Sequence, residues 1–149
     1  MLADWVNEQK DPAGTWEKIP GRSFSECTLG VIGVGNCGKA VIRRARAFGM
    51  TILGTDIIEI APDFIKENGV ETTPLEDLLQ CADYISLNCD LNPTSHHLIN
   101  ARTLALMKPG AVLINTSRGP VVDESALVAA LQQGAIAGAA LDVYEEEPL

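Results

Sequence analysis

Three glycines with the spacing G-x-G-x-x-G stand at Gly33, Gly35 and Gly38, where an apolar run gives way to a helical pattern. The first glycine would allow a tight turn, and the second would let a phosphate approach the backbone without meeting a Cβ. The third would let the helix pack close to the strand. The helix would also present free N–H groups and the positive end of its dipole to an anion. The spacing therefore indicates a phosphate-binding turn.

An acidic residue completes this pattern. Asp56 comes just after a second apolar run, 50–54, and it follows Gly38 at close to the roughly 20 residues expected for an acid that binds ribose hydroxyls. Strand, turn, helix, strand and acid in this order predict a dinucleotide site. The alternative is a glycine turn that only closes a βαβ unit, which explains Gly38 but gives no reason for Gly35 and Asp56 together.

Polar residues also follow the later apolar runs. Ligands of an open parallel sheet bind beyond the carboxyl ends of its strands, where the strand order reverses. We therefore expect the residues at these ends to share one site. The candidate cofactor-binding residues are Gly33, Gly35, Asn36, Cys37, Gly38, Asp56, Asn88, Cys89, Asn92, Thr94, Thr116, Ser117, Arg118 and Asp142.

Arg118 is the candidate with the clearest chemistry, because Gly119 and Pro120 hold its loop in place. A guanidinium there can clamp a carboxylate with two parallel hydrogen bonds. An ion pair with Asp123 or Asp142 explains the arginine equally well, and the sequence leaves both interpretations open.

The histidines and the last glutamates are weaker candidates. Neighbouring residues point to opposite sides in regular structure, and we interpret His96 and His97 as surface or adenine-side residues rather than catalysts. Glu145, Glu146 and Glu147 are adjacent, and we expect most of them to be solvated.

Alternating strands and helices must position these groups. The pattern predicts an α/β fold, a doubly wound parallel sheet of the Rossmann type in three layers with strand order 3-2-1-4-5-6. We interpret Thr73-Pro74-Leu75-Glu76 as a capping box with proline at the first helical position. We expect strands at 29–34, 50–54, 70–72, 84–88, 111–115 and 136–143, and helices up to Gly49, over 60–67, after 73–76, over 101–107 and from Asp123 to Gln133.

Composition and charge narrow the class of protein. The 149 residues suit one domain, and 46% hydrophobic with 21% charged residues is typical of a globular chain. The net charge of −9 argues against nucleic-acid binding, which needs clustered Lys and Arg. No apolar run approaches the roughly 18 residues of a membrane span. The four cysteines have neither C-x-x-C nor zinc-site spacing, so we expect free thiols in a reducing cytoplasm and no metal site.

Three blocks of sequence go further than these patterns. They are LGVIGVGNCGKAV, MKPGAVLINTSRGPVVDESALVAAL and GAALDVYEEEP. With them the chain resembles the nucleotide-binding domain of the D-isomer-specific 2-hydroxyacid dehydrogenases. The resemblance implies an NAD-binding Rossmann domain over 28–149, and a segment over 1–27 that crosses in from a separate substrate domain. It also implies NAD as the cofactor, a small 2-oxo or 2-hydroxy acid as the substrate, and a homodimer in which Leu2, Trp5, Val6 and Trp16 find cover.

The resemblance assigns roles to four residues. Arg118 matches the arginine that holds the carboxylate and carbonyl of the keto acid, and Glu147 matches the glutamate that pairs with the catalytic histidine. Asp142 matches a residue at the nicotinamide end of the cofactor, and Asp56 matches the acid that favours NAD over NADP. The catalytic histidine is expected some tens of residues after Glu147, in a Pro-x-x-His context. We therefore expect the isolated chain to bind the cofactor and to be inactive.

Two departures and two alternatives accompany this interpretation. Many relatives have His and Pro where this chain has Asn88 and Asp90, which leaves the substrate open among phosphoglycerate, glycerate and hydroxypyruvate types. The first alternative is an NAD-sensing corepressor of the same fold, which turnover would exclude. The second is another adenosine-binding protein, such as a methyltransferase, which the NTSRG and DVYEEEP blocks disfavour.

Overall fold

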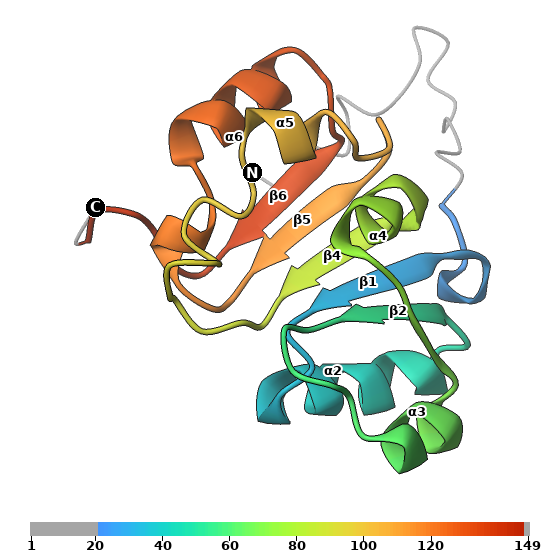
Figure 1. The fold of residues 1–149 in the computed structure, drawn as a ribbon. Helices are drawn as coiled ribbons and strands as arrows, with labels where there is room; N and C mark the ends of the chain where they lie inside the picture. Colours follow the sequence, from blue (N-terminus) through green and yellow to red (C-terminus); the bar gives the residue numbers. More distant parts are fainter. Residues whose placement is uncertain (1–20, 148–149) are drawn as a thin grey trace, which may run out of the picture.

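The computed structural model describes residues 21–147 and contains a six-stranded sheet in which every pair of strands is parallel. The strand order is β3-β2-β1-β4-β5-β6, which confirms the predicted doubly wound topology (Figure 1). Strand order reverses between β1 and β4, and this is where the glycine turn lies. The strands are β1 (Thr28–Ile32), β2 (Thr51–Thr55), β3 (Val70–Thr72), β4 (Tyr84–Leu87), β5 (Val112–Asn115) and β6 (Gly138–Leu141).

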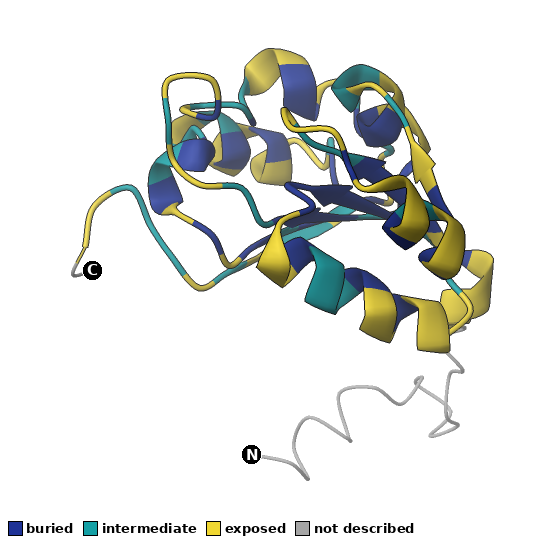
Figure 2. Ribbon diagram, turned by 60° about the horizontal axis from the view of Figure 1, so that its bottom comes forward, coloured by how far each residue is buried: buried dark blue, intermediate teal, exposed yellow. Residues whose placement is uncertain are grey.

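Helices lie on both sides of this sheet (Figure 2). The longest, α2, follows the glycine turn and buries Gly38, Ile42 and Ala45, while its last turn carries Arg44 and Arg46 at the negative end of the helix dipole. The helices are α2 (Asn36–Ala47), α3 (Pro62–Asn68), α4 (Leu75–Cys81), α5 (Ala101–Leu104) and α6 (Glu124–Gln132), with 3-10 turns η1 (Phe24–Glu26) and η2 (Gly119–Val121).

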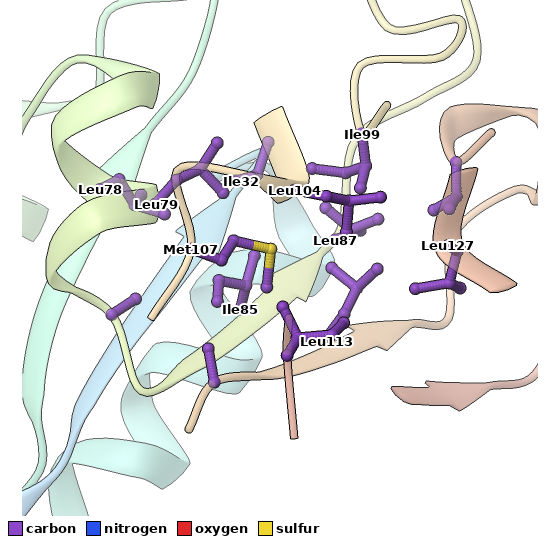
Figure 3. Close-up of a cluster of buried hydrophobic side chains, with 14 of the residues drawn as sticks. Ile32, Leu78, Leu79, Ile85, Leu87, Ile99, Leu104, Met107, Leu113 and Leu127 are labelled. Carbon is purple, nitrogen blue, oxygen red and sulfur yellow. The ribbon is translucent and has the colours of Figure 1, made fainter. Parts of the chain in front are cut away.

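Two hydrophobic clusters hold the layers together, one on each face of the sheet. The larger joins the central strands to α4, α5 and α6, and it includes Ile85 of β4, Leu113 of β5 and Leu78 of α4 (Figure 3). The smaller joins β1, β2 and β3 to α2 and α3, and it includes Val31 of β1 and Phe64 of α3. Because side chains alternate along a strand, adjacent residues of β1 and β2 enter different clusters.

Two predicted helix ends are wrong. Pro74 is the N-cap of α4 rather than its first helical residue, and no side-chain bond caps that end. The reason is that the Thr73 N–H donates to the Gly54 carbonyl and so continues the pairing of β3 with β2. The helix expected over 101–107 ends at Leu104.

Four of the six predicted strands are longer than the observed ones, while β3 has the predicted bounds and β2 the predicted length. The last strand, expected over 136–143, is confined to Gly138–Leu141 because its partner β5 offers only four residues, from Val112 to Asn115. Residues 1–20 lie outside the described part, and with them Leu2, Trp5, Val6 and Trp16, which were expected to be covered in a homodimer. No helix within residues 21–147 is long and apolar enough to cross a membrane.

Candidate functional site

The glycine turn connects β1 to α2, and two of its glycines are required by packing. Gly33 has a φ of +88°, and a Cβ there would lie 2.6 Å from the Cys89 backbone nitrogen. A Cβ on Gly38 would lie 2.1 Å from the Gly33 carbonyl oxygen. The turn is therefore pressed against both its own helix and the loop after β4.

Gly35 differs from these two glycines. Its φ of −73° suits any residue, and an added Cβ would meet no described atom within 4 Å. Gly35 is also the N-cap of α2, so the unpaired N–H groups of the first helical turn lie next to this open space. The arrangement fits a phosphate that approaches the backbone where a Cβ would otherwise stand.

Asp56 is fixed at the end of β2 by two backbone donors. Its Oδ2 accepts from the Val34 N–H at 2.6 Å, and its Oδ1 accepts from the Ile58 N–H at 2.9 Å. The first bond joins the carboxylate directly to the glycine turn. A diol that binds this carboxylate is thereby held in register with a phosphate on the turn.

A pocket of about 270 Å³ lies between the carboxyl ends of β1, β2 and β4. Ile57 and Ile58 line it with 79% and 73% of their surface exposed, which suits the face of a flat aromatic base. Sequence reasoning missed both, although two apolar residues directly after a strand-ending acid are a signal that could have found them. Of the predicted residues, the pocket brings together Gly33, Gly35, Asp56, Asn88, Cys89, Asn92 and Thr94.

Side chains of the loop after β4 hold that loop in shape. The Asn88 Nδ2 donates to the carbonyl and hydroxyl oxygens of Ser86, at 3.1 and 3.0 Å. The Asn92 Oδ1 accepts from the Thr94 N–H at 2.8 Å and from its hydroxyl at 2.6 Å. Asn92 thus shapes the pocket wall, and its amide oxygen is already engaged by its own loop.

Two of the predicted cysteines lie on either side of the turn. Cys37 is exposed in the first turn of α2, next to Asn36, and Cys89 is half-buried in the pocket wall. Burial raises the pKa of the Cys89 thiol, so the thiol stays protonated at neutral pH. All four cysteines are free, as expected.

Asn115, at the end of β5, builds the loop that presents Arg118. Its Oδ1 accepts from the N–H and hydroxyl of Ser117, at 3.0 and 2.8 Å, and its Nδ2 donates to the Arg118 carbonyl at 3.0 Å. Asn115 is 1% exposed. Sequence reasoning missed it, because a polar residue that ends a buried strand gives no signal of where its amide will turn.

Arg118 itself is exposed, and its Nη1 donates to the Ser117 carbonyl at 2.7 Å. Among residues 21–147 no carboxylate forms an ion pair with it, so the structure does not contain the pair with Asp123 or Asp142 that the sequence left open. Thr116 is exposed beside it and Ser117 is buried.

The segment after β6 carries Asp142 and the three glutamates. Asp142 is exposed, and its N–H donates to the Asn115 carbonyl. Glu146 and Glu147 follow Glu145 along the segment, and the Glu147 Oε1 accepts from the Tyr144 N–H at 2.9 Å. Thr116, Ser117, Arg118, Asp142 and Glu147 share the carboxyl edge of the sheet but do not line the 270 Å³ pocket.

His97 and Glu145 form a contact that the sequence did not predict, whereas Glu146 and Glu147 are exposed as expected. Glu145 is half-buried, and its Oε1 lies 2.5 Å from the His97 Nε2. The loop turns the His97 ring towards the segment after β6, and its side chain remains 37% exposed, so the contact with Glu145 adds to its interpretation as a surface residue. The ring of His96 stacks on that of His97 with centroids 4.1 Å apart.

Comparisons with known proteins agree with this geometry. Residues 3–149 match the model of the NAD-binding domain of D-isomer specific 2-hydroxyacid dehydrogenases. A glyoxylate reductase of Korarchaeum cryptofilum is 52% identical over 122 residues, which are 82% of this chain and 36% of the relative. A putative 2-hydroxyacid dehydrogenase of Staphylococcus aureus is 49% identical over 128 residues, which are 86% of this chain and 40% of the relative.

Solved structures give the same result. A D-lactate dehydrogenase from Aquifex aeolicus, complexed with NAD and lactic acid, superposes with a TM-score of 0.84 at 40% identity, covering 97% of this chain and 41% of that one. A D-lactate dehydrogenase from Treponema pallidum reaches a TM-score of 0.87 at 37% identity, covering 98% of this chain and 43% of the other. This chain therefore spans less than half the length of these relatives.

Proposed function

The chain belongs to the D-isomer-specific 2-hydroxyacid dehydrogenase family as its NAD-binding domain, and from this we propose that it serves an oxidoreductase acting on a 2-hydroxy or 2-oxo acid. In such an enzyme the bound NAD carries the hydride to or from the substrate carbon. This chain contributes the residues that hold the cofactor and orient the substrate.

The observation that carries the proposal is the preformed cofactor turn. Gly35 leaves open space beside the first turn of α2, and Asp56 is bound to the Val34 N–H of the same turn. The pyrophosphate binds the N–H groups at Gly35, and the adenosine ribose binds Asp56. The exposed side chains of Ile57 and Ile58 cover the adenine.

Arg118 and Glu147 act at the other end of the cofactor. The Arg118 guanidinium has no carboxylate partner among the described residues, so it is available to hold the carboxylate and polarise the carbonyl of the 2-oxo acid. Asp142 contacts the nicotinamide end. Glu147 pairs with the histidine that delivers the proton, which raises the pKa of the imidazole and orients it.

The names of the relatives favour a small 2-oxo acid as the substrate. The relative from Korarchaeum cryptofilum is named a glyoxylate reductase, and glyoxylate or hydroxypyruvate would present one carboxylate and one carbonyl to Arg118. The corepressor alternative is disfavoured, because the relatives reported above are named as reductases or dehydrogenases. We also propose a homodimer and, since all four cysteines are free thiols, a cytoplasmic location.

Turnover measurements test this proposal. We expect the 149-residue chain to bind NADH in a fluorescence titration without oxidising it in the presence of glyoxylate or hydroxypyruvate, because the proton-delivering histidine is expected beyond Glu147. A longer form of the protein that includes the Pro-x-x-His segment and the substrate domain should oxidise NADH with one of these acids. Oxidation by the 149-residue chain alone would contradict the assignment of the missing histidine, and no turnover by the longer form would contradict the dehydrogenase function.

A further inference from the structure

Three loops at the carboxyl edge of the sheet meet in a cluster that the proposed function does not use. We call His97, Glu124 and Glu145 the clasp. The His97 Nε2 lies 2.5 Å from the Glu145 Oε1. The Glu124 N–H donates to the Glu145 Oε2 at 3.1 Å, and the Glu145 N–H donates back to the Glu124 Oε1 at 2.7 Å. The clasp thus joins the loop after β4, the start of α6 and the segment after β6.

The loop around His97 is bent to make this contact. His97 has a φ of +48°, in the left-handed region that residues other than glycine rarely adopt. Its N–H donates to the Pro120 carbonyl at 2.8 Å, and the Asn100 Nδ2 donates to its carbonyl at 2.8 Å. A strained backbone that the surrounding bonds hold in place is a feature of sites with a specific task.

The charges in the cluster favour the pair. The hydrogen bond from His97 lowers the pKa of Glu145, against the opposing effect of burial and with help from the Glu124 N–H. Glu145 is therefore an ionised acceptor at neutral pH. The neighbouring carboxylate, Asp123, is occupied by the Ser125 hydroxyl and the Ala126 N–H at the N-terminus of α6.

The segment that contains Glu145 also contacts the loop of Arg118 and carries Glu147, the two groups assigned to the substrate end. Gly119, next to Arg118, is packed so closely on this segment that a Cβ there would lie 1.8 Å from the Tyr144 carbonyl oxygen. Tyr144 in turn donates its N–H to the Glu147 side chain. Glu145 is therefore the anchored residue of a short segment that touches the Arg118 loop at one end and carries Glu147 at the other.

We propose that His97 and Glu145 are positioning residues, which hold the segment bearing Glu147 against the loop bearing Arg118 so that both reach the substrate together. This inference rests on the proposed function. A displacement of about 1 Å in such groups can lower a rate by up to roughly a hundredfold. Glu147 would also raise the pKa of the catalytic histidine less well from a displaced position.

The main test compares variants of the longer, active form of the protein. We expect His97→Ala to lower kcat for the 2-oxo acid by roughly tenfold or more, with NADH affinity within about twofold of wild type because the cofactor turn is unchanged. The pH above which activity falls should decrease, because a displaced Glu147 raises the pKa of the catalytic histidine less and that histidine then loses its proton at a lower pH. His97→Gln, which keeps a donor at a similar reach, should restore most of kcat and the pH profile. The matched control is His96→Gln, which changes the neighbouring imidazole and should leave both unchanged.

A second measurement does not depend on activity. In the 149-residue chain, amide hydrogen exchange at Glu124 and Glu145 reports the two backbone donors of the clasp, and we expect His97→Ala to speed both. Wild-type kcat and pH profile in His97→Ala would overturn the proposal, as would unchanged exchange at both amides. An inactive wild-type enzyme whose amides still respond would instead count against the proposed dehydrogenase function while supporting the coupling of the loops.

Discussion

Gly38 and Gly35 of the turn differ in their surroundings, so substitutions at the two positions should affect stability and cofactor binding differently. Gly38 has no room for a Cβ, whereas Gly35 has room in the protein itself. We expect Gly35→Ala to change the free energy of unfolding by no more than about 1 kcal/mol, since the backbone there suits alanine. NADH affinity should fall by roughly tenfold or more, because the Cβ occupies the space of the pyrophosphate. Fluorescence titration and urea unfolding measure the two effects.

A matched glycine provides the control. An added Cβ on Gly110 also meets no described atom within 4 Å, and Gly110 lies in the turn before β5, outside the pocket lining. Gly110→Ala should leave both NADH affinity and stability near wild type. NADH binding by Gly35→Ala with wild-type affinity would show that the turn is structural and does not hold the cofactor.

Asp56 is the residue that we propose to set the preference between the two nicotinamide cofactors. Its carboxylate is aimed by the Val34 and Ile58 N–H groups, and an asparagine has only one acceptor oxygen for them. Losing a hydrogen bond to a charged group costs about 1.5–3 kcal/mol, so we expect Asp56→Asn to weaken NADH binding roughly 10- to 100-fold. NADPH should be affected less, since the variant also removes repulsion of its extra phosphate.

Parallel titrations with NADH and NADPH measure this preference. Glu59→Gln is the control, because Glu59 is an exposed carboxylate of the same loop and does not line the 270 Å³ pocket. Equal affinity of the wild-type chain for NADH and NADPH would contradict the role given to Asp56.

Asp83 connects strands of the sheet at their amino ends, opposite the edge that carries the glycine turn. Its side chain is 10% exposed and accepts from the Thr28 N–H at 2.8 Å, from Arg22 at 3.0 Å and from Lys108 at 3.2 Å. Burial by itself would raise the pKa of Asp83, but these three donors outweigh it and lower the pKa below its ordinary value. One carboxylate thus connects β1, β4, the residues before β1 and the turn before β5.

This junction makes stability depend on pH in a defined direction. Because the pKa of Asp83 is lower in the folded state, its contribution is complete above the unfolded value of about 3.9 and is lost as pH falls through the folded value. We expect Asp83→Asn to lower the free energy of unfolding at pH 7 by about 1–3 kcal/mol. The difference from wild type should shrink below about pH 4.

Urea unfolding at a series of pH values between about 7 and 3 measures this difference. Glu71→Gln is the control, since Glu71 is an exposed carboxylate of β3 and should change stability little at any pH. If the difference in free energy of unfolding between Asp83→Asn and wild type stays constant or grows as the pH falls, Asp83 does not stabilise the fold as an ionised acceptor.

The elements also show what sequence can predict. The alternation of strands and helices after the glycine turn was enough for the strand order, because the central strands β1, β2 and β4 are apolar and buried along most of their length. The residues at which strands and helices begin and end were less predictable. Thr73 remains paired to β2, and the capping box of α5 uses Asn100 and Thr103 instead of a glutamate. The His97–Glu145 contact joins residues 48 positions apart, and no local pattern encodes such a pairing.

In the described part of the molecule, residues 21–147, the two faces of the sheet are covered unevenly. On one face, α4, α5 and α6 cover the sheet with the larger cluster, and on the other α2 and α3 cover β1, β2 and β3. Val112 and Ile114 of β5 point to the second face but belong to neither cluster, and both are only half-buried. Parallel sheets normally have both faces covered. Within residues 21–147, an apolar strip made by Val112 and Ile114 of β5 therefore remains open.

In the proposed homodimer, we expect the second chain to pack against this strip and bury it. We expect light scattering at tens of micromolar to give the mass of two chains, because apolar surface of this kind favours association. Ile114→Lys, which places a charge on the strip, should give one chain, while Val128→Lys should not, since Val128 is 52% exposed on α6, on the other side of the sheet. A wild-type mass of one chain would contradict the dimer. A dimer that persists in Ile114→Lys would place its interface elsewhere.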